Sequence, residues 1–487
     1  MPTRVLIAGP AERAREVARA VAARGQEPTV VSAAPLGWVR RREADVLLTI
    51  SGPRWVHLVR TRGARRVAHV DTAPWVRRGR LRPFLDPRLR ALRRADLVTA
   101  TPAAAEALHR SGRIAVARTA ASADEIAAVL EGPGEPAGGL KILLLGTVNT
   151  PHVEHMALAM RERGHRVVVA GEVTPAYAPS VLPAAGIPVR PLELPAVPWL
   201  YRLRRAERPD VVHANWLPSY AFLAALVRLR PLVAMAWGSD VYGATPAQDR
   251  RSRFALRRAV VAMSDSEDLV ARMVGLGADP AATFLLNWGV DLESFAPAAD
   301  RAAVRRSLGL GDGPVVLSPR ALQPLYNPGV IVDAFADAAG GVDGAQLLLK
   351  HIGTGEPDVG RELPKGARVV GHVPYQRLAD YYRAADVCVS IPDSDSSPRS
   401  VWEAMACGCA CVISDLPWAR ELIVDGEHAL LVAPEREAVA AALRRLLTEP
   451  GLATGIGSRA RALVERHRDE RAEMDRLARL YESLVAR

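Results

Sequence analysis

Lysine is almost missing from this chain of 487 residues. Lysine and arginine together number 64, but lysine occurs only at positions 141, 350 and 365. This arginine bias, with so much alanine, is typical of genome composition, so the net charge of +11 is weak evidence for nucleic-acid binding. No zinc finger, RRM or comparable signature accompanies it, and we expect no nucleic-acid partner. The excess charge favours anionic partners such as phosphorylated sugars or lipid headgroups.

The chain also has few cysteines, and it lacks any apolar run of about 18 residues. Its four cysteines, at positions 388, 407, 409 and 411, lack zinc-type spacing, which predicts reduced, mostly buried thiols and no metal site. The sequence runs from Met1 directly into a strand pattern. We therefore expect neither a spanning helix nor a signal peptide, and we predict a cytoplasmic protein.

Strand patterns alternate with helical patterns along most of the chain. A strand at 141–146, a helical stretch and a second strand at 164–170 form a βαβ opening. Such interleaving predicts parallel, doubly wound sheets, and the length favours about three domains. A Gly- and Pro-rich stretch at 131–139 is a linker by composition. We predict domains at 140–298 and 299–460, followed by a helix at 461–487.

The first 132 residues resemble an abbreviated copy of the domain that follows them. Residues 4–9 parallel 141–146, and residues 94–102 parallel 258–266. We therefore predict an extra Rossmann-like module at 1–132, and a degenerate repeat is one interpretation of it. Because any two α/β half-domains share such strands, two unrelated modules are the other interpretation.

Two acids follow an apolar strand pattern at residues 385–391. Asp395 and Glu403 lie eight positions apart, and a helix is predicted to begin near Ser397. The unpaired N–H groups and the positive dipole end of a helix start attract a diphosphate. This combination of acids and free amides predicts a site for a sugar nucleotide.

The same stretch carries a family resemblance. Glu403 lies in Glu-Ala-Met-Ala-Cys-Gly, and the passage resembles the Glu-x7-Glu signature of the retaining glycosyltransferases of family 4, with Asp395 in place of the first glutamate. Residues 287–295 resemble the passage in which that family crosses between its halves. The resemblance implies an α/β, GT-B fold of two facing Rossmann-like domains with parallel sheets, here with the extra N-terminal module.

The resemblance also implies a donor site on residues 299–460. A nucleotide diphosphate sugar would be a substrate, and no cofactor or metal is expected. Asp395 would contact the transferred sugar, Glu403 the ribose, and Arg320 the diphosphate. The family's lysine position holds Asn327, and the candidate replacement is Lys350 at a strand end, with a surface lysine as the alternative. Further donor contacts are implied for Ser396, Ser397, Pro398, Arg399, Ser400, His372 and Val373.

The acceptor side of the cleft is implied on residues 140–298. Trp237 stands where the family usually has histidine. Asp240 either orients a hydroxyl group or caps the next helix, and His152 either lines the cleft or has a capping role. The acceptor-side candidates are Gly146, Thr147, His152, His213, Trp237, Gly238 and Asp240.

We therefore predict a retaining, metal-independent glycosyltransferase with a nucleotide-sugar donor and a glycan, lipid-linked or small-molecule acceptor. The alternative is a non-catalytic sugar-nucleotide-binding or interaction protein on the same scaffold, which the substitutions at Asp395, Asn327 and Trp237 favour. An epimerase or hydrolase is a third class. The arginine-rich segment from Arg77 to Arg94 predicts either peripheral contact with anionic membrane or a solvated face.

Overall fold

The computed structural model describes residues 4–9, 11–24, 27–32, 46–50, 65–70, 97–100, 118–119, 139–174, 180–351, 359–371, 373 and 375–486. The chain divides into two compact units. Unit 1 comprises residues 1–215, 219–233 and 481–487, and unit 2 comprises residues 216–218 and 234–480. The predicted membrane segment from Arg77 to Arg94 and the predicted donor contact His372 lie outside the described residues.

The first part of unit 1 contains a parallel sheet of six strands in the order β2-β1-β3-β4-β5-β6. Its strands are β1 (Arg4–Gly9), β2 (Glu27–Ser32), β3 (Val46–Ile50), β4 (Arg65–Val70), β5 (Leu97–Ala100) and β6 (Arg118–Thr119), with helix α1 at Ala11–Ala22. A parallel sheet that begins with a strand, a helix and a second strand agrees with the Rossmann-like module predicted for this part of the chain. The predicted domain boundaries stay predictions.

A second sheet has seven strands in the order β13-β12-β11-β10-β7-β8-β9. The strands are β7 (Lys141–Leu145), β8 (Arg166–Gly171), β9 (Val189–Pro191), β10 (Val211–Asn215), β11 (Leu232–Met235), β12 (Val261–Ser264) and β13 (Thr283–Leu285). The helices are α5 (Pro151–Glu162), α6 (Ala196–Glu207), α7 (Phe222–Leu226), α8 (Pro246–Leu256) and α9 (Glu267–Gly275). The division between the two units passes through β11.

The third sheet lies in unit 2 and has the order β16-β15-β14-β17-β18-β19, with every pair parallel. Its strands are β14 (Val315–Ser318), β15 (Gln346–Lys350), β16 (Ala367–Val370), β17 (Val387–Ser390), β18 (Ala410–Ser414) and β19 (Leu430–Val432). Because the order reverses at β14, the crevice beyond the carboxyl ends of β14 and β17 is the position where such sheets bind ligands.

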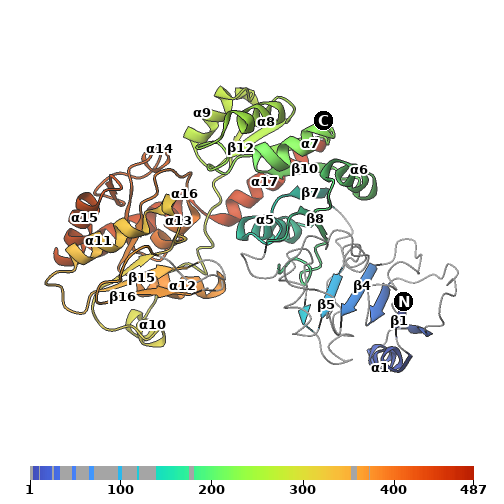
Figure 1. Cartoon of the computed structure of the whole chain (residues 1–487), viewed down its shortest axis with the longest axis horizontal. Coiled ribbons are helices and arrows are strands. Elements are labelled where there is room, and N and C mark those ends of the chain that lie inside the picture. The colour runs from blue at the N-terminus through green and yellow to red at the C-terminus, as the bar shows by residue number, and fades with distance from the viewer. Residues whose placement is uncertain are drawn as a thin grey trace. The chain divides into compact units, whose positions relative to one another are not determined.

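Both faces of the third sheet are covered, which explains why its strands are almost continuously apolar. Leu317 and Cys388 belong to one core cluster, and their neighbours Val316 and Val389 belong to the other. Helices α11 and α15 lie side by side over the second face (Figure 1). The helices of this region are α10 (Arg301–Ser307), α11 (Pro328–Ala338), α12 (Tyr375–Ala384), α13 (Arg399–Ala406), α14 (Pro417–Arg420), α15 (Arg436–Thr448) and α16 (Leu452–His467).

Two sequence predictions concern the cysteines and the C-terminal helix. All four cysteines are free and buried, as their spacing predicted. The single helix predicted at 461–487 is wrong, because α16 ends at His467 and α17 begins at Glu470 and runs to Val485. Among the described residues, no helix is both long and apolar enough to cross a membrane.

Candidate active site

Arg320 lies two residues beyond the carboxyl end of β14, at the reversal of strand order. Its Nη2 atom is 2.8 Å from Asp395 Oδ2, and its Nη1 atom donates to Ser400 Oγ at 3.1 Å. The guanidinium also lies 4.3 Å from the centre of the Tyr326 ring. Burial lowers the pKa of Arg320, but Asp395 and Tyr326 outweigh it and raise the pKa above its ordinary value. A permanent positive charge is thus held in the crevice.

Asp395 lies in the middle of the loop that joins β17 to α13. One carboxylate oxygen forms the ion pair with Arg320, and the other accepts a hydrogen bond from the Ser396 amide at 2.9 Å. Ser397 has a left-handed backbone, with φ of 40°, and its hydroxyl accepts a hydrogen bond from Trp402 Nε1 at 3.0 Å. The loop conformation is therefore fixed by its own residues and by α13.

Helix α13 begins just after Pro398, and no side chain caps it. Pro398 is buried, and Arg399 and Ser400, which open the first turn, are half-buried. An uncapped helix start presents N–H groups and a positive dipole end, so this one can receive an anion. Of the sequence-predicted donor residues, Ser396 to Ser400 thus come together with Arg320 and Asp395.

Glu403 lies one turn into α13 and is almost fully buried. Its Oε1 accepts from Arg399 Nε at 3.0 Å, and its Oε2 accepts from the Tyr382 hydroxyl at 3.3 Å. Arg399 in turn donates to Glu470 at 2.7 Å. Glu403 therefore belongs to a network of charged and polar groups, which the signature alone did not predict. Neither Tyr382 nor Glu470 is part of the signature.

Lys350 is the last residue of β15, beside β14 in the sheet. Burial lowers the pKa of Lys350, an effect that the Glu403 carboxylate opposes and the Arg320 guanidinium reinforces. Among the described residues, no carboxylate forms an ion pair with its ammonium. The other lysines differ, since Lys141 pairs with Glu207 at 2.8 Å and Lys365 is exposed. Lys350 is thus a half-buried cation in the same charged region as Arg320 and Glu403.

Asn327, at the family's lysine position, has a structural role. Its backbone is left-handed, with φ of 51°, a conformation that asparagine tolerates better than most residues. Its side-chain nitrogen donates to Ile391 O at 3.0 Å and to Asp393 Oδ1 at 2.7 Å. Asn327 therefore ties the loop after β14 to the loop after β17.

Asp265 follows β12 and belongs to the site, although no sequence motif predicted it. The Ser396 hydroxyl forms hydrogen bonds with Asp265 Oδ1 and, at 2.8 Å, with the Ser266 hydroxyl. Burial raises the pKa of Asp265 to about 8, the Ser396 hydrogen bond opposes this, and the nearby Asp395 charge adds to it. At neutral pH Asp265 is therefore mostly protonated. Its position after a strand end was the available sequence signal.

Trp237, Gly238 and Asp240 form the loop after β11. The Asp240 carboxylate accepts from the amides of Leu217 and Trp237, each at 2.8 Å, so it organises loop backbone and does not cap the following helix. Burial raises the pKa of Asp240 to about 6 in spite of these bonds. A Cβ on Gly238 would lie 3.1 Å from the Ser396 Cβ. Gly238 is thus packed directly against Ser396, in the loop between β17 and α13. The ring of the half-buried Trp237 lies 5.8 Å from the Trp288 ring, centre to centre.

Unit 1 holds the other acceptor-side candidates. Gly146 is buried at the end of β7, and a Cβ there would lie 3.1 Å from Val153, while Thr147 and His152 are half-buried. The prediction for His213 is wrong in one respect, because this residue of β10 is fully buried and cannot line a cleft. Its Nδ1 lies 2.7 Å from the Tyr481 hydroxyl, and burial lowers the pKa of His213 to about 3. His213 is a neutral core histidine because it lies in the interior of a strand and faces Tyr481 of α17.

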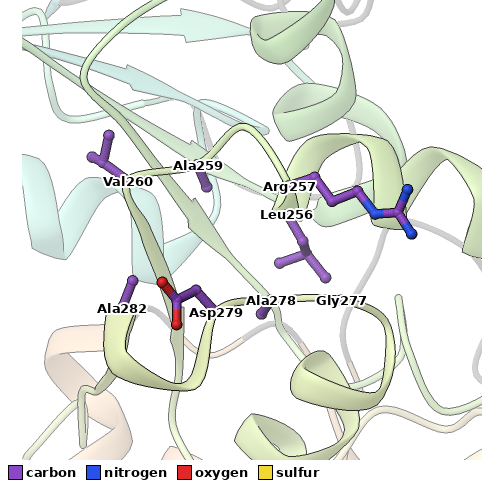
Figure 2. Close-up of a pocket in the computed structure, with 8 residues that line it drawn as sticks. All are labelled: Leu256, Arg257, Ala259, Val260, Gly277, Ala278, Asp279 and Ala282. Carbon is purple, nitrogen blue, oxygen red and sulfur yellow. The ribbon is translucent and has the colours of Figure 1, made fainter.

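Unit 2 also contains the donor candidate Val373 and a separate hollow. Val373 packs against the core of the third sheet. A separate hollow of about 480 Å³ lies at the turns before β12 and after α9 (Figure 2). It is lined mainly by small and apolar residues, at the opposite end of β12 from Asp265. Among the described residues, no group of three or more His, Cys, Asp or Glu side chains is arranged to hold a metal ion.

Two family models match the chain. The model described as "Glycosyl transferases group 1" matches residues 315–449, and the model described as "Glycosyl transferase 4-like" matches residues 141–271. The first match contains the third sheet with Arg320, Asp395 and Glu403. The second contains most of the seven-stranded sheet, and residues 1–132 lie outside both.

Curated relatives named D-inositol 3-phosphate glycosyltransferase also match. The protein from Kineococcus radiotolerans is 35% identical over 209 residues, which are 38% of this chain and 48% of that protein. The chain thus spans about half the length of this relative. The protein from Actinosynnema mirum is 31% identical over 383 residues, which cover 68% of this chain and 89% of the relative.

A solved structure, Anabaena Alr3699/HepE in complex with UDP-glucose, superimposes with a TM-score of 0.62 at 20% sequence identity. The match covers 71% of this chain and all of the Anabaena chain. At this level of identity the likeness concerns the fold. It confirms the predicted α/β fold class with parallel sheets.

Proposed function

The chain belongs to the group 1 glycosyltransferases of glycosyltransferase family 4, and we propose that it transfers a sugar from a nucleotide diphosphate donor to an acceptor hydroxyl group. The observation that carries the proposal is the assembly at the carboxyl ends of β14 and β17. There Arg320, paired with Asp395 at 2.8 Å, lies beside the uncapped start of α13. A fixed cation next to free helix amides is the environment that a leaving diphosphate requires.

Each group in this assembly has a proposed role. Arg320 and Lys350 neutralise the diphosphate, and the amides that open α13 bind its oxygens. Asp395, which Arg320 and the Ser396 amide hold in place, accepts hydrogen bonds from the transferred sugar. Glu403 accepts from the ribose hydroxyls. Because Arg320 and Lys350 supply positive charge from side chains, the proposed reaction needs no metal ion.

We further propose that the transfer retains configuration at the anomeric carbon. Asp395 is engaged by Arg320, so it is a poor nucleophile, and the leaving diphosphate is the base nearest to the reacting carbon. The bond from the anomeric carbon to the diphosphate oxygen breaks, and the acceptor oxygen bonds to the same face. The acceptor proton passes to the diphosphate, which leaves as the nucleoside diphosphate, so atoms and charge balance.

Nucleotide binding gives the first test. The thermal midpoint would be measured with UDP-, GDP-, ADP- and dTDP-sugars, since a ligand of the folded state raises its stability. We expect a shift with one nucleotide class, its loss in Glu403→Gln, and its retention in the control Glu465→Gln, whose half-exposed carboxylate pairs with Arg461. No shift with any of the four donors would refute the proposed donor site.

Turnover gives the second test. With the donor identified, release of nucleoside diphosphate would be followed with glycans, lipid-linked sugars and small molecules, including D-inositol 3-phosphate, which the relatives' name mentions. We expect Asp395→Asn to lower turnover more than nucleotide binding. Donor binding without transfer to any acceptor would favour a non-catalytic binding protein, and donor consumption without acceptor would favour a hydrolase or epimerase.

A further inference from the structure

Arg399, the first residue of α13, holds two carboxylates at once. Its Nε donates to Glu403 Oε1 at 3.0 Å, and its Nη2 donates to Glu470 Oε1 at 2.7 Å. The side chains of Arg399, Glu403 and Glu470 are 9%, 3% and 12% exposed, so water and salt screen their charges only weakly. One guanidinium is thus shared between the proposed ribose-binding carboxylate and the first residue of α17.

The backbone of Glu470 is itself fixed. Its amide donates to Val290 O at 3.2 Å, and the Val290 amide donates to Arg468 O at 2.7 Å. A Cβ on Gly289 would lie 2.4 Å from the Glu470 Cα, so only glycine permits this close approach. The Arg468 guanidinium lies 4.2 Å from the centre of the Trp402 ring. Glu470 is therefore held by backbone hydrogen bonds and by the side chain of Arg399 on α13.

Glu470 limits the hydrogen bonds that Arg399 can donate to Glu403. A guanidinium and a carboxylate readily form a bidentate pair with two parallel hydrogen bonds. Here Glu470 takes Nη2 of Arg399, which leaves Nε for Glu403, and Glu403 Oε2 accepts from Tyr382. The two oxygens of the Glu403 carboxylate thus accept from different donors, Arg399 and Tyr382.

We propose that Glu470 is a positioning residue for nucleotide binding, because it restrains Arg399 and thereby fixes the orientation of the Glu403 carboxylate. The inference rests on the proposed function, since it assumes that Glu403 binds the nucleotide ribose. Without the Glu470 charge, Arg399 turns both nitrogen donors toward Glu403 and draws the carboxylate away from its ligand. Donor affinity then depends on α17, a helix outside both matched family models.

The test is calorimetric titration of the full chain with UDP, GDP, ADP and dTDP. For the nucleotide that binds the parent, we expect Glu470→Gln to weaken binding about tenfold, which corresponds to 1.4 kcal/mol. Glu465→Gln removes a comparable charge from an ion pair that does not touch Glu403, and it should bind like the parent. Glu470→Asp keeps the charge on a shorter side chain and should give an intermediate affinity.

Two readouts separate positioning from general support of the fold. Glu470→Gln should raise the donor KM and change kcat less than twofold. Because both residues act through one contact, the double variant Arg399→Met with Glu470→Gln should bind no more weakly than Arg399→Met alone. A global loss of structure would instead lower the thermal midpoint and kcat together, and that result would overturn the proposal.

The failure of this inference and that of the proposed function give different results. If Glu470→Gln binds like the parent while Glu403→Gln loses binding, Glu470 has no positioning role and the donor site stands. If both variants bind like the parent, Glu403 is not the ribose contact and the donor site is wrong as well. If the parent binds none of the four nucleotides, both proposals are overturned.

Discussion

Replacing Asp265 by asparagine should stabilise the protein at neutral and alkaline pH. Asp265 is almost fully buried, and burial raises its pKa from an ordinary value of 3.8 to about 8. Between these two pH values the folded chain keeps a proton that the unfolded chain has lost. Unfolding free energy therefore falls as the pH rises through this window, and the loss is complete above about pH 8.

The size of this effect follows from the same shift. Each pH unit within the window costs about 1.4 kcal/mol, so at pH 7 the penalty is on the order of 4 kcal/mol. Asparagine has nearly the same shape, can still form a hydrogen bond with Ser396, and carries no charge to bury or to repel Asp395. The variant should thus lack the penalty without creating a cavity.

The measurement is urea unfolding of the parent and Asp265→Asn between pH 5 and pH 9. Asp240, whose pKa burial raises to about 6, is present in both proteins, so its contribution cancels in their difference. The stability difference should grow with pH and level off above about pH 8. Asp279→Asn, at an exposed turn, controls for the lost charge. A difference that is independent of pH, or a less stable variant at pH 8, would refute the reasoning.

Three further substitutions test the packing of the site and of unit 1. Gly238→Ala places a Cβ 3.1 Å from the Ser396 Cβ at a φ of 94°, and it should cost about 1–3 kcal/mol in thermal unfolding; an unchanged midpoint would contradict the close packing. Tyr481→Phe removes the hydroxyl beside buried His213 and should cost about 1–3 kcal/mol in urea unfolding, with no cost expected if the contact is absent. Asn327→Lys restores the family's cation, but it loses two hydrogen bonds at a left-handed position, so turnover should fall and the midpoint should drop; higher turnover would show that the site lacks a cation.

Much of the fold could be predicted because apolar strands and family motifs are local in sequence. Residues 141–146 and 385–391 predicted strands of parallel sheets, and the structure has β7 and β17 there. The break between α16 and α17 was missed, because residues 459–487 contain no proline and continue a helical pattern across Arg468 and Asp469. Helix α16 ends because of a tertiary contact, in which the backbones of Arg468 and Glu470 form hydrogen bonds with the backbone of Val290.

The members of the site were predictable where one motif carries them. Asp395 and Glu403 share the signature, and the structure brings both to the carboxyl end of β17. Glu470 and Asp265 were missed because each comes from a distant part of the chain. Glu470 contacts Arg399, and Asp265 contacts Ser396. His213 was placed wrongly because a histidine in an apolar strand pattern next to family motifs looks the same in sequence whether it faces solvent or Tyr481.

The departures from the family pattern fit one another in the structure. Asn327 supplies no cation, yet it occupies a left-handed position and ties two loops together through Ile391 and Asp393. Lys350, from the neighbouring strand, places a half-buried amine near Arg320 and Glu403. Asp395, although shorter than glutamate, reaches Arg320 at 2.8 Å. Two basic side chains thus remain in the crevice after the family's lysine is lost, so these substitutions give less support to a non-catalytic protein than they do in the sequence alone.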